Sequence, residues 1–263
     1  MDKVEFDISR FPKEREIVID AGYLASGRHI IYALLEVDVT DARRIINEWS
    51  STNLEKLSFT AYIVASLAKA IEAFPQVHTF RDWRGRLYTF NDVDVVTMIE
   101  PRPGAVAIPH IIRDANNKTV IVISNEIRVI QARPESSEQS GSLVKLAPKV
   151  PRIFRMAFFK FLKMYPPRFK SLAGTVVVTS VGMFGKGGGW GIGFLPTHNL
   201  GITVGGITRK PGVFGDEIAI REYLNLTLSF DHDIIDGAPA ARFASKFSEL
   251  LEKAAVLKDG TKD

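Results

Sequence analysis

The order of hydrophobic and polar positions along the chain predicts both helices and strands. FTAYIVASLAKAIEAF has apolar residues at helical spacing and stops before Pro75, whereas EYLNLTLSF alternates apolar and polar positions as a half-buried strand does. Further strands are expected in HIIYALLEVDV, RGRLYTF, VDVVTMI, TVVVTSV and LGITVGGI. Further helices are expected in SNEIRVIQA, opened by a Ser124 cap, and in AARFASKFSELLEKA. The pattern therefore predicts a mixed α/β fold.

The simplest domain organisation is one domain over residues 1–263, with a basic insert at about 138–170. No internal repeat is visible, and ARPESSEQSGS is polar enough to form an exposed connection. The bounds of the insert are taken from the distribution of charge. No acidic residue lies between Glu138 and Asp216, and Lys and Arg cluster early in that stretch.

Within the insert, PRIFRMAFFKFLKMYPP predicts a short amphipathic helix that stops at Pro166 and Pro167. Three interpretations of this segment compete. It could rest on an anionic membrane surface, help attract the phosphates of a cofactor, or pack as an ordinary helix with a solvated basic side. Ordinary packing is the favoured interpretation, because charge runs usually solvate a surface.

Composition narrows the classes of function. The chain has 263 residues, 46% hydrophobic and 24% charged, which is typical of a soluble globular protein. The absence of cysteine excludes disulfides, thiolate nucleophiles and cysteine-ligated metals. No apolar run approaches the roughly 20 residues of a membrane span, and the charged start is unlike a secretory signal, so a cytoplasmic location is expected. A net charge of +4 favours anionic ligands only weakly and does not indicate nucleic acid.

The strongest candidate for chemistry is His232, at the end of the strand EYLNLTLSF. Asp236 and Gly237 follow it at a strand-to-helix junction. An imidazole is suited to take and return a proton near neutral pH, and a carboxylate four residues later can organise its surroundings. Taken alone, the pattern fits a hydrogen-bonded histidine beside a turn equally well. The remaining histidines, at positions 29, 78, 110 and 198, are expected to be structural.

The segment LTLSFDHDIIDGAPAARF closely resembles the active-site signature of the 2-oxoacid dehydrogenase acyltransferase cores, which are grouped with the chloramphenicol acetyltransferases. ALLEVDVTDARRI, LSFTAYIVASLAKAIEAFPQV, AIPHIIRDANNKTV, GTVVVTSVGMFG and LGITVGGITRKPGV follow the order of that family. The resemblance implies a chloramphenicol acetyltransferase-like two-layer α/β sandwich with a mixed sheet. It also implies a homotrimer whose active sites lie between subunits, with coenzyme A entering from one side and the acceptor from the other.

The resemblance also implies roles for particular residues. His232 would deprotonate the attacking group, and Thr179 would donate a hydrogen bond to the oxyanion. Ser180 is the alternative donor, because a strand directs only one of two neighbouring side chains to a given face. Both hydroxyls could instead merely cap a turn before Gly182. Asp236 is interpreted as a catalytic-loop carboxylate that organises structure without accepting the proton.

Arg113, Asp114, Gly182 and Met183 fall in segments that the family places near the cofactor. A charged turn with no ligand role is an equally good interpretation of the first two. Coenzyme A or acyl-CoA is the expected substrate. No metal is expected, because no His, Asp or Glu cluster has ligand spacing, and KGGGWGIG lacks the order of a phosphate-binding loop.

Three departures from the family bear on function. The chain begins at the core, so no covalently attached lipoyl group is expected in it, and the acceptor would be a lipoyl domain or a small molecule supplied in trans. Asp233 stands where the family usually has arginine, which should raise the proton affinity of His232. The polar end VLKDGTKD predicts an isolated trimer. The leading hypothesis is a coenzyme A-dependent acyltransferase, and the alternative is an inactive trimeric scaffold or acyl-CoA-binding subunit.

Overall fold

The computed structural model describes residues 6–13, 15–53, 56–100, 108–138, 147–181 and 187–260. Its main feature is a six-stranded mixed sheet in the order β1-β8-β7-β6-β4-β5. The strands are β1 (Ile30–Asp38), β4 (Val95–Ile99), β5 (Ile108–Ile112), β6 (Val176–Ser180), β7 (Leu200–Phe214) and β8 (Glu217–Asp231). Strands β4, β6 and β7 run parallel, and the other neighbours in the sheet pair antiparallel.

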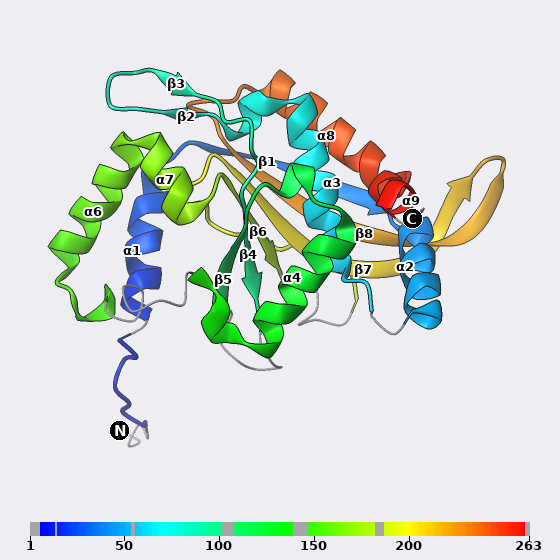
Figure 1. Ribbon diagram of the computed structural model, residues 1–263, viewed down its shortest axis with the longest axis horizontal. Helices are drawn as coiled ribbons and strands as arrows, with labels where there is room; N and C mark the ends of the chain where they lie inside the picture. Colours follow the sequence, from blue (N-terminus) through cyan, green and yellow to red (C-terminus); the bar gives the residue numbers. More distant parts are fainter. Residues whose placement is uncertain are drawn as a thin grey trace, which may run out of the picture.

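Helices cover one face of this sheet and form the second layer (Figure 1). They are α2 (Thr40–Thr52), α3 (Phe59–Ala73), α4 (Val120–Ala132), α8 (Gly237–Glu252) and α9 (Ala255–Gly260). Helix α3 lies at the centre of this layer. It is apolar on nearly every side, begins where the Ser58 hydroxyl accepts the N–H of Ala61, and buries ten of its fifteen residues. Such a helix is stable only inside a core.

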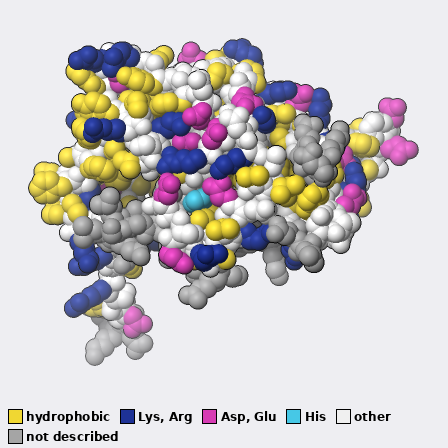
Figure 2. Space-filling model, viewed as in Figure 1, with side chains coloured by type: hydrophobic (Ala, Val, Ile, Leu, Met, Phe, Trp, Pro, Cys, Tyr) yellow, Lys and Arg dark blue, Asp and Glu magenta, His cyan; other side chains and the backbone are white. Residues whose placement is uncertain are grey.

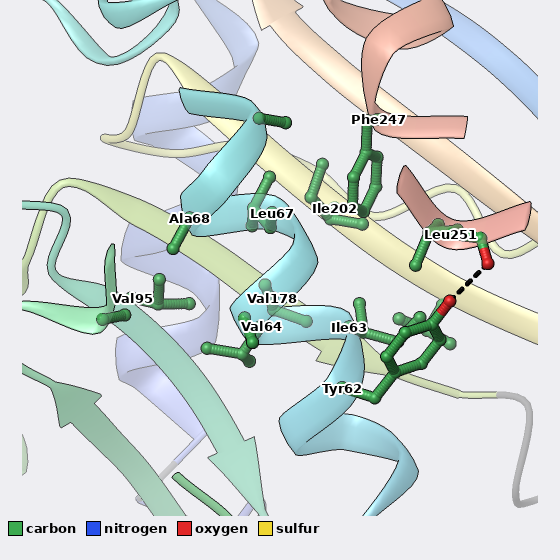
Figure 3. Close-up of a cluster of buried hydrophobic side chains, with 14 of the residues drawn as sticks. Tyr62, Ile63, Val64, Leu67, Ala68, Val95, Val178, Ile202, Phe247 and Leu251 are labelled. Carbon is green, nitrogen blue, oxygen red and sulfur yellow. Dashed lines mark hydrogen bonds between the residues drawn. The ribbon is translucent and has the colours of Figure 1, made fainter. Parts of the chain in front are cut away.

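The core between the two layers is continuous and tightly packed. Figure 3 shows Leu67 of α3 close to Ile202 of β7 and Phe247 of α8, all almost fully buried. Tyr62 is buried as well, and its hydroxyl donates to the carbonyl of Leu251. That bond satisfies the one polar group this ring carries into the core, and burial raises the pKa of the Tyr62 hydroxyl.

Strands β7 and β8 form a hairpin longer than the sequence pattern predicts. Their pairing runs from Leu200 with Phe230 out to Phe214 with Glu217. The outer part projects beyond the helices (Figure 1) and leaves Val213 and Ile218 exposed. Because both faces of this part are open, its residues do not alternate between apolar and polar, and the pattern that predicted the inner strands fails there.

A bulge interrupts β7 at Gly205 and Gly206, where the register with β8 shifts. The described part of the glycine-rich segment lies against this bulge, since the N–H of Gly206 donates to the carbonyl of Gly189 at 3.0 Å. A Cβ atom at either bulge residue would collide with a backbone carbonyl oxygen of that segment. Glycine is therefore required by the close approach of two backbones.

Several local predictions are wrong. Helix α4 begins at Val120 rather than Ser124, and its cap is Thr119, whose hydroxyl accepts the N–H of Val122. Ser124 is buried inside the helix and accepts the N–H of Ser58. The β-branched first turn hid the helical start, because such residues do not signal a helix. RGRLYTF is mostly loop, with only β3 (Leu87–Tyr88) pairing with β2 (Phe80–Arg81).

A separate group of helices lies at one end of the molecule, at the left of Figure 1. It consists of α1 (Arg15–Ser26), α6 (Arg152–Met164) and α7 (Pro166–Ala173). The predicted helix in the basic segment is confirmed as α6, which ends at Met164 and has Tyr165 as its C-cap just before the two prolines. Those prolines open α7, because proline fits the first turn of a helix. None of the helices in the described ranges is long and apolar enough to cross a bilayer.

Candidate functional site

His232 is presented by the meeting of two antiparallel strand ends. Strand β8 ends at Asp231, which pairs with Ile30 at the start of β1. The pairing continues one step further, because the N–H of His232 donates to the carbonyl of His29 at 2.7 Å. The imidazole of His232 itself is exposed and makes no hydrogen bond to the described residues. The backbone of His232 is thus fixed by strand pairing, while its ring nitrogens have no partner among the described residues.

Asp231, immediately before His232, forms a buried ion pair with Arg28. Its carboxylate accepts from the Arg28 guanidinium at 2.5 Å, and the same guanidinium donates to Asn199 Oδ1 at 2.7 Å. Both charged side chains are buried, with 4% and 9% of their side-chain surface exposed. Arg28 Nε and Nη1 are buried without a partner among the described residues. Two buried nitrogens of this cation, next to His232 in the strand pairing, therefore donate to no other described residue.

Asp233 is directed at His29. Its Oδ1 lies 2.9 Å from His29 Nδ1, and this hydrogen bond and the accompanying charge raise the pKa of His29. The same contact lowers the pKa of Asp233. From the sequence we expected this carboxylate to raise the proton affinity of His232. In the structure its hydrogen-bond partner is His29. A carboxylate engaged in an ion pair has less of its charge to offer to a second neighbour.

Asp236 occupies the N-cap position of α8, with φ −75° and ψ 163°. Its side chain is exposed and makes no capping hydrogen bond. The carboxylate therefore interacts favourably with the positive end of the helix but is not locked there. The contacts that hold the loop around His232 in the structure are those of Asp231 and Asp233. The role of Asp236 in organising the loop remains a prediction.

Thr179 and His232 are not brought together within one chain. Thr179 pairs with Thr203 of β7, which pairs with Thr227 of β8. His232 lies five residues beyond Thr227, which is about 17 Å along the strand at roughly 3.3 Å per residue. A hydrogen-bond donor must lie about 3 Å from the oxyanion that it stabilises. Thr179 and His232 of the same chain therefore cannot serve the same reacting carbonyl.

The two neighbouring hydroxyls of β6 face opposite sides of the sheet. Val176 and Val178 belong to the core beneath the helices, so strand alternation places Ser180 on that side too. Thr179 lies on the other face, beside Thr203 in the next strand. Of the two hydroxyls, only that of Thr179 therefore lies on the face of the sheet that α3 and its neighbouring helices do not cover. Gly182 and Met183 lie outside the described residues.

Arg113 and Asp114 are engaged in holding the fold. The Arg113 guanidinium donates to Asp94 at 3.1 Å and to the carbonyls of Lys170 and Ser171. Asp114 adopts a left-handed backbone, with φ 50°, and its N–H donates to Asp94 at 2.9 Å. These contacts tie the end of β5 to α7. The role of either residue toward a cofactor stays a prediction.

The other histidines show why His232 stands apart. His78 and His198 are buried, and their Nε2 atoms pair with the carbonyls of Phe90 and Ala173. Burial lowers the pKa of each to about 4, so both are neutral at neutral pH. His110 pairs with Glu126 at 3.0 Å. His29 is hydrogen-bonded to Asp233, and its backbone carbonyl accepts the N–H of His232.

Sequence reasoning missed Arg28 and His29 as members of this site. Arg28 directly precedes the predicted strand HIIYALLEVDV and His29 is its first residue, and neither stands in a motif. The available signal was the pairing of that strand with EYLNLTLSF, since antiparallel partners bring the start of one next to the end of the other. A pairing hypothesis would have placed both residues beside His232.

Comparison with known proteins finds a similar family and similar folds. The family model "2-oxoacid dehydrogenases acyltransferase (catalytic domain)" matches residues 170–258. One curated relative is the dihydrolipoyllysine-residue acetyltransferase component of the pyruvate dehydrogenase complex of Rickettsia typhi, 28% identical over 82% of this chain and 46% of that protein. The chain thus spans about half the length of the curated relatives it matches.

Solved structures show the fold. A probable dihydrolipoamide acetyltransferase from Listeria monocytogenes superposes with a TM-score of 0.69 at 21% identity, covering 95% of each chain. A chloramphenicol acetyltransferase superposes with a TM-score of 0.55 at 13% identity, covering 94% of this chain and 98% of that one. The predicted chloramphenicol acetyltransferase-like sandwich with a mixed sheet is confirmed, and so is the resemblance to the acyltransferase cores.

Proposed function

We propose that this chain, which belongs with the catalytic domains of the 2-oxoacid dehydrogenase acyltransferases, transfers an acyl group between coenzyme A and a thiol, amine or hydroxyl acceptor. The observation that carries the proposal is the exposed imidazole of His232, held at the end of β8 inside the matched segment 170–258. A free imidazole nitrogen on a rigid backbone is what a general base requires.

The proposed reaction uses His232 to move one proton out and back. The imidazole accepts the proton of the acceptor group, whose heteroatom then adds to the thioester carbonyl carbon. A tetrahedral oxyanion forms, and a hydroxyl donor stabilises it. When the carbon–sulfur bond breaks, the leaving thiolate of coenzyme A takes the proton from the imidazolium. Atoms and charge balance over the cycle, and the histidine returns to its neutral form.

The oxyanion donor in this proposal is Thr179 of the partner subunit. About 17 Å separates the two positions along the sheet of one chain, so a site with both groups has to be assembled from two copies. A homotrimer with cyclic symmetry supplies such a junction three times, because each copy then presents one surface to the next. Ser180, on the core side of β6, is the weaker candidate donor.

The acceptor is proposed only by class. The relative from Rickettsia typhi is named for a dihydrolipoyllysine residue, which presents a thiol, and a lipoyl group brought by another chain would fit this reaction. A diffusing small molecule would fit it as well. Arg28 Nε and Nη1, which have no partner among the described residues, suit an acceptor that carries a hydrogen-bond-accepting oxygen near the reacting atom.

The test is acyl transfer from acetyl-CoA to a panel of thiol and amine acceptors by the intact chain. His232→Ala should lower kcat by about 10²–10⁴-fold while coenzyme A binding, followed by calorimetry, is retained. Thr179→Ala should lower it by about 10²–10³-fold, and Ser180→Ala serves as the matched control with little change. Equal turnover of His232→Ala and the unaltered chain would refute the base assignment. Coenzyme A binding with no transfer to any acceptor would favour the inactive scaffold.

A further inference from the structure

Helix α6 carries its apolar side outward. An aromatic stripe, defined as Ile153, Phe154, Phe158, Phe161 and Tyr165, is 73%, 65%, 52%, 40% and 39% exposed. At 100° per residue these five positions fall in one arc of about 140° along the helix. The buried residues of α6 are Arg155 and Leu162, which lie outside this arc. A surface helix normally has the reverse arrangement.

Ion pairs on its inner side fix the rotation of α6 about its axis. Arg155 donates to Asp20 of α1 at 2.6 Å and to Glu16 at 3.1 Å, and only 6% of its side chain is exposed. Arg152 pairs with Asp20 at 3.2 Å. Turning the stripe inward would separate these buried charges, which is strongly unfavourable. The outward stripe is therefore built into the fold.

Leu162 attaches the inner side of α6 to the rest of the molecule by apolar packing. It packs with Phe80 and Phe169 in a second, smaller apolar cluster. The anchor is small, so α6 contributes little to the core and exposes most of its apolar surface. A contiguous exposed apolar surface rimmed by polar residues marks an interaction site. Figure 2 shows hydrophobic side chains gathered with Lys and Arg on the side of the molecule where Figure 1 places α6.

The charges around the stripe are positive. No acidic residue occurs between Glu138 and Asp216, and Lys149, Lys160 and Arg168 are exposed beside the stripe. Arg168 lies over the Phe161 ring at 5.8 Å, which extends the stripe with a cation. An anionic bilayer offers an apolar layer beneath a negatively charged surface, and thus complements both features. A second copy docked through the same face would instead oppose cations to cations.

We propose that α6 docks the protein on an anionic lipid bilayer, with the aromatic stripe at the boundary between headgroups and acyl chains. The flanking cations contact the anionic headgroups. This contact is independent of the acyl transfer proposed above, because it uses neither His232 nor Thr179.

The experiment is sedimentation of the full chain with vesicles of phosphatidylcholine alone or with about a third phosphatidylserine. The chain should bind the anionic vesicles, and binding should fall as salt rises. The variant Phe154→Ser/Phe158→Ser/Phe161→Ser should lower the partition coefficient about tenfold or more. Val213→Ser/Ile218→Ser is the matched control, since these apolar residues are even more exposed on the far hairpin, and it should bind as the unaltered chain does.

A second readout keeps the test sharp if the triple variant folds poorly. Phe158→Trp preserves an aromatic ring, and its emission should shift to the blue on anionic vesicles. Lys149→Gln/Lys160→Gln should weaken binding without altering the stripe. The proposal is overturned if the chain fails to sediment with anionic vesicles. It is also overturned if the stripe variant changes only the mass measured by light scattering, because the face would then join copies of the chain.

Discussion

Helices α3 and α6 are both rich in apolar residues, yet they use them in opposite ways. Helix α3 buries ten of fifteen residues between the sheet and the other helices. Helix α6 buries two of thirteen, one of them the ion-paired Arg155, and turns its aromatic side to the surface. Apolar content alone therefore does not tell which helix builds the core. The position of the charges does, because α3 has one lysine and one glutamate near its end while α6 has cations throughout.

The two regions also differ in completeness. On the α3 side the hydrogen bond between Tyr62 and Leu251 satisfies one buried hydroxyl, and the buried Ser66 hydroxyl of the same helix is without a partner among the described residues. Within the described part of the chain, the end that carries α6 and His232 leaves groups without partners: an aromatic stripe, an exposed imidazole, and Nε and Nη1 of Arg28. Unused groups gathered at one end are typical of the functional side of a protein.

The largest expected effect is a loss of packing in the α3 core. Phe247→Ala should lower the free energy of unfolding by about 3–5 kcal/mol, because the ring is fully buried and leaves a cavity. Phe158→Ala on α6 should change it by less than about 0.5 kcal/mol, since 52% of that residue is exposed. Urea unfolding of both variants measures the comparison. Equal losses would mean that α6 is covered by part of the same protein.

The next effect concerns what holds α6 in place. Arg155→Ala should lower the free energy of unfolding, because it leaves the Asp20 carboxylate buried with only Arg152 to pair with it. The double variant Asp20→Leu/Arg155→Met should recover most of that loss, since an apolar pair of similar volume replaces the buried charges. Thermal unfolding of the two proteins provides the measurement. A double variant as unstable as the single one would show that these charges do more than fix the helix.

A smaller effect should follow acidification. The pKa of His78 and of His198 is about 4 in the fold and near 6.5 when unfolded, so between these values the unfolded chain binds more protons. The free energy of unfolding should therefore fall as the pH drops from 6.5 to 4, by about 2 kcal/mol per histidine at pH 5. Urea unfolding at pH 7 and pH 5 tests this. His198→Gln, whose amide can still donate to Ala173, should reduce the pH dependence, and an unchanged dependence would contradict the assignment.

Much of the fold follows from the sequence wherever burial imposes a period. The helix of α3 and the inner parts of β6, β7 and β8 are predicted because each has one or two buried faces. The outer hairpin is not, since neither of its faces is covered. Helix α1 is not predicted either: its only buried residue is Asp20, so an ion pair rather than an apolar face holds it.

The site was only partly predictable. His232 and Thr179 come from the family resemblance, and the strand alternation that favours Thr179 over Ser180 depends on knowing that Val178 faces the core. Arg28 and His29 become visible only through the pairing of β1 with β8. Pairing partners far apart in the chain are set by the tertiary fold, and no local pattern encodes them.

The most direct test of the central claim uses co-expressed chains that carry His232→Ala or Thr179→Ala. If each site combines His232 of one chain with Thr179 of the partner subunit, neither variant alone transfers acyl groups well, but about one quarter of the junctions in random mixed trimers contain both intact groups. The account predicts that acyl transfer in the mixture rises far above that of either parent. A mixture no more active than its parents would contradict it.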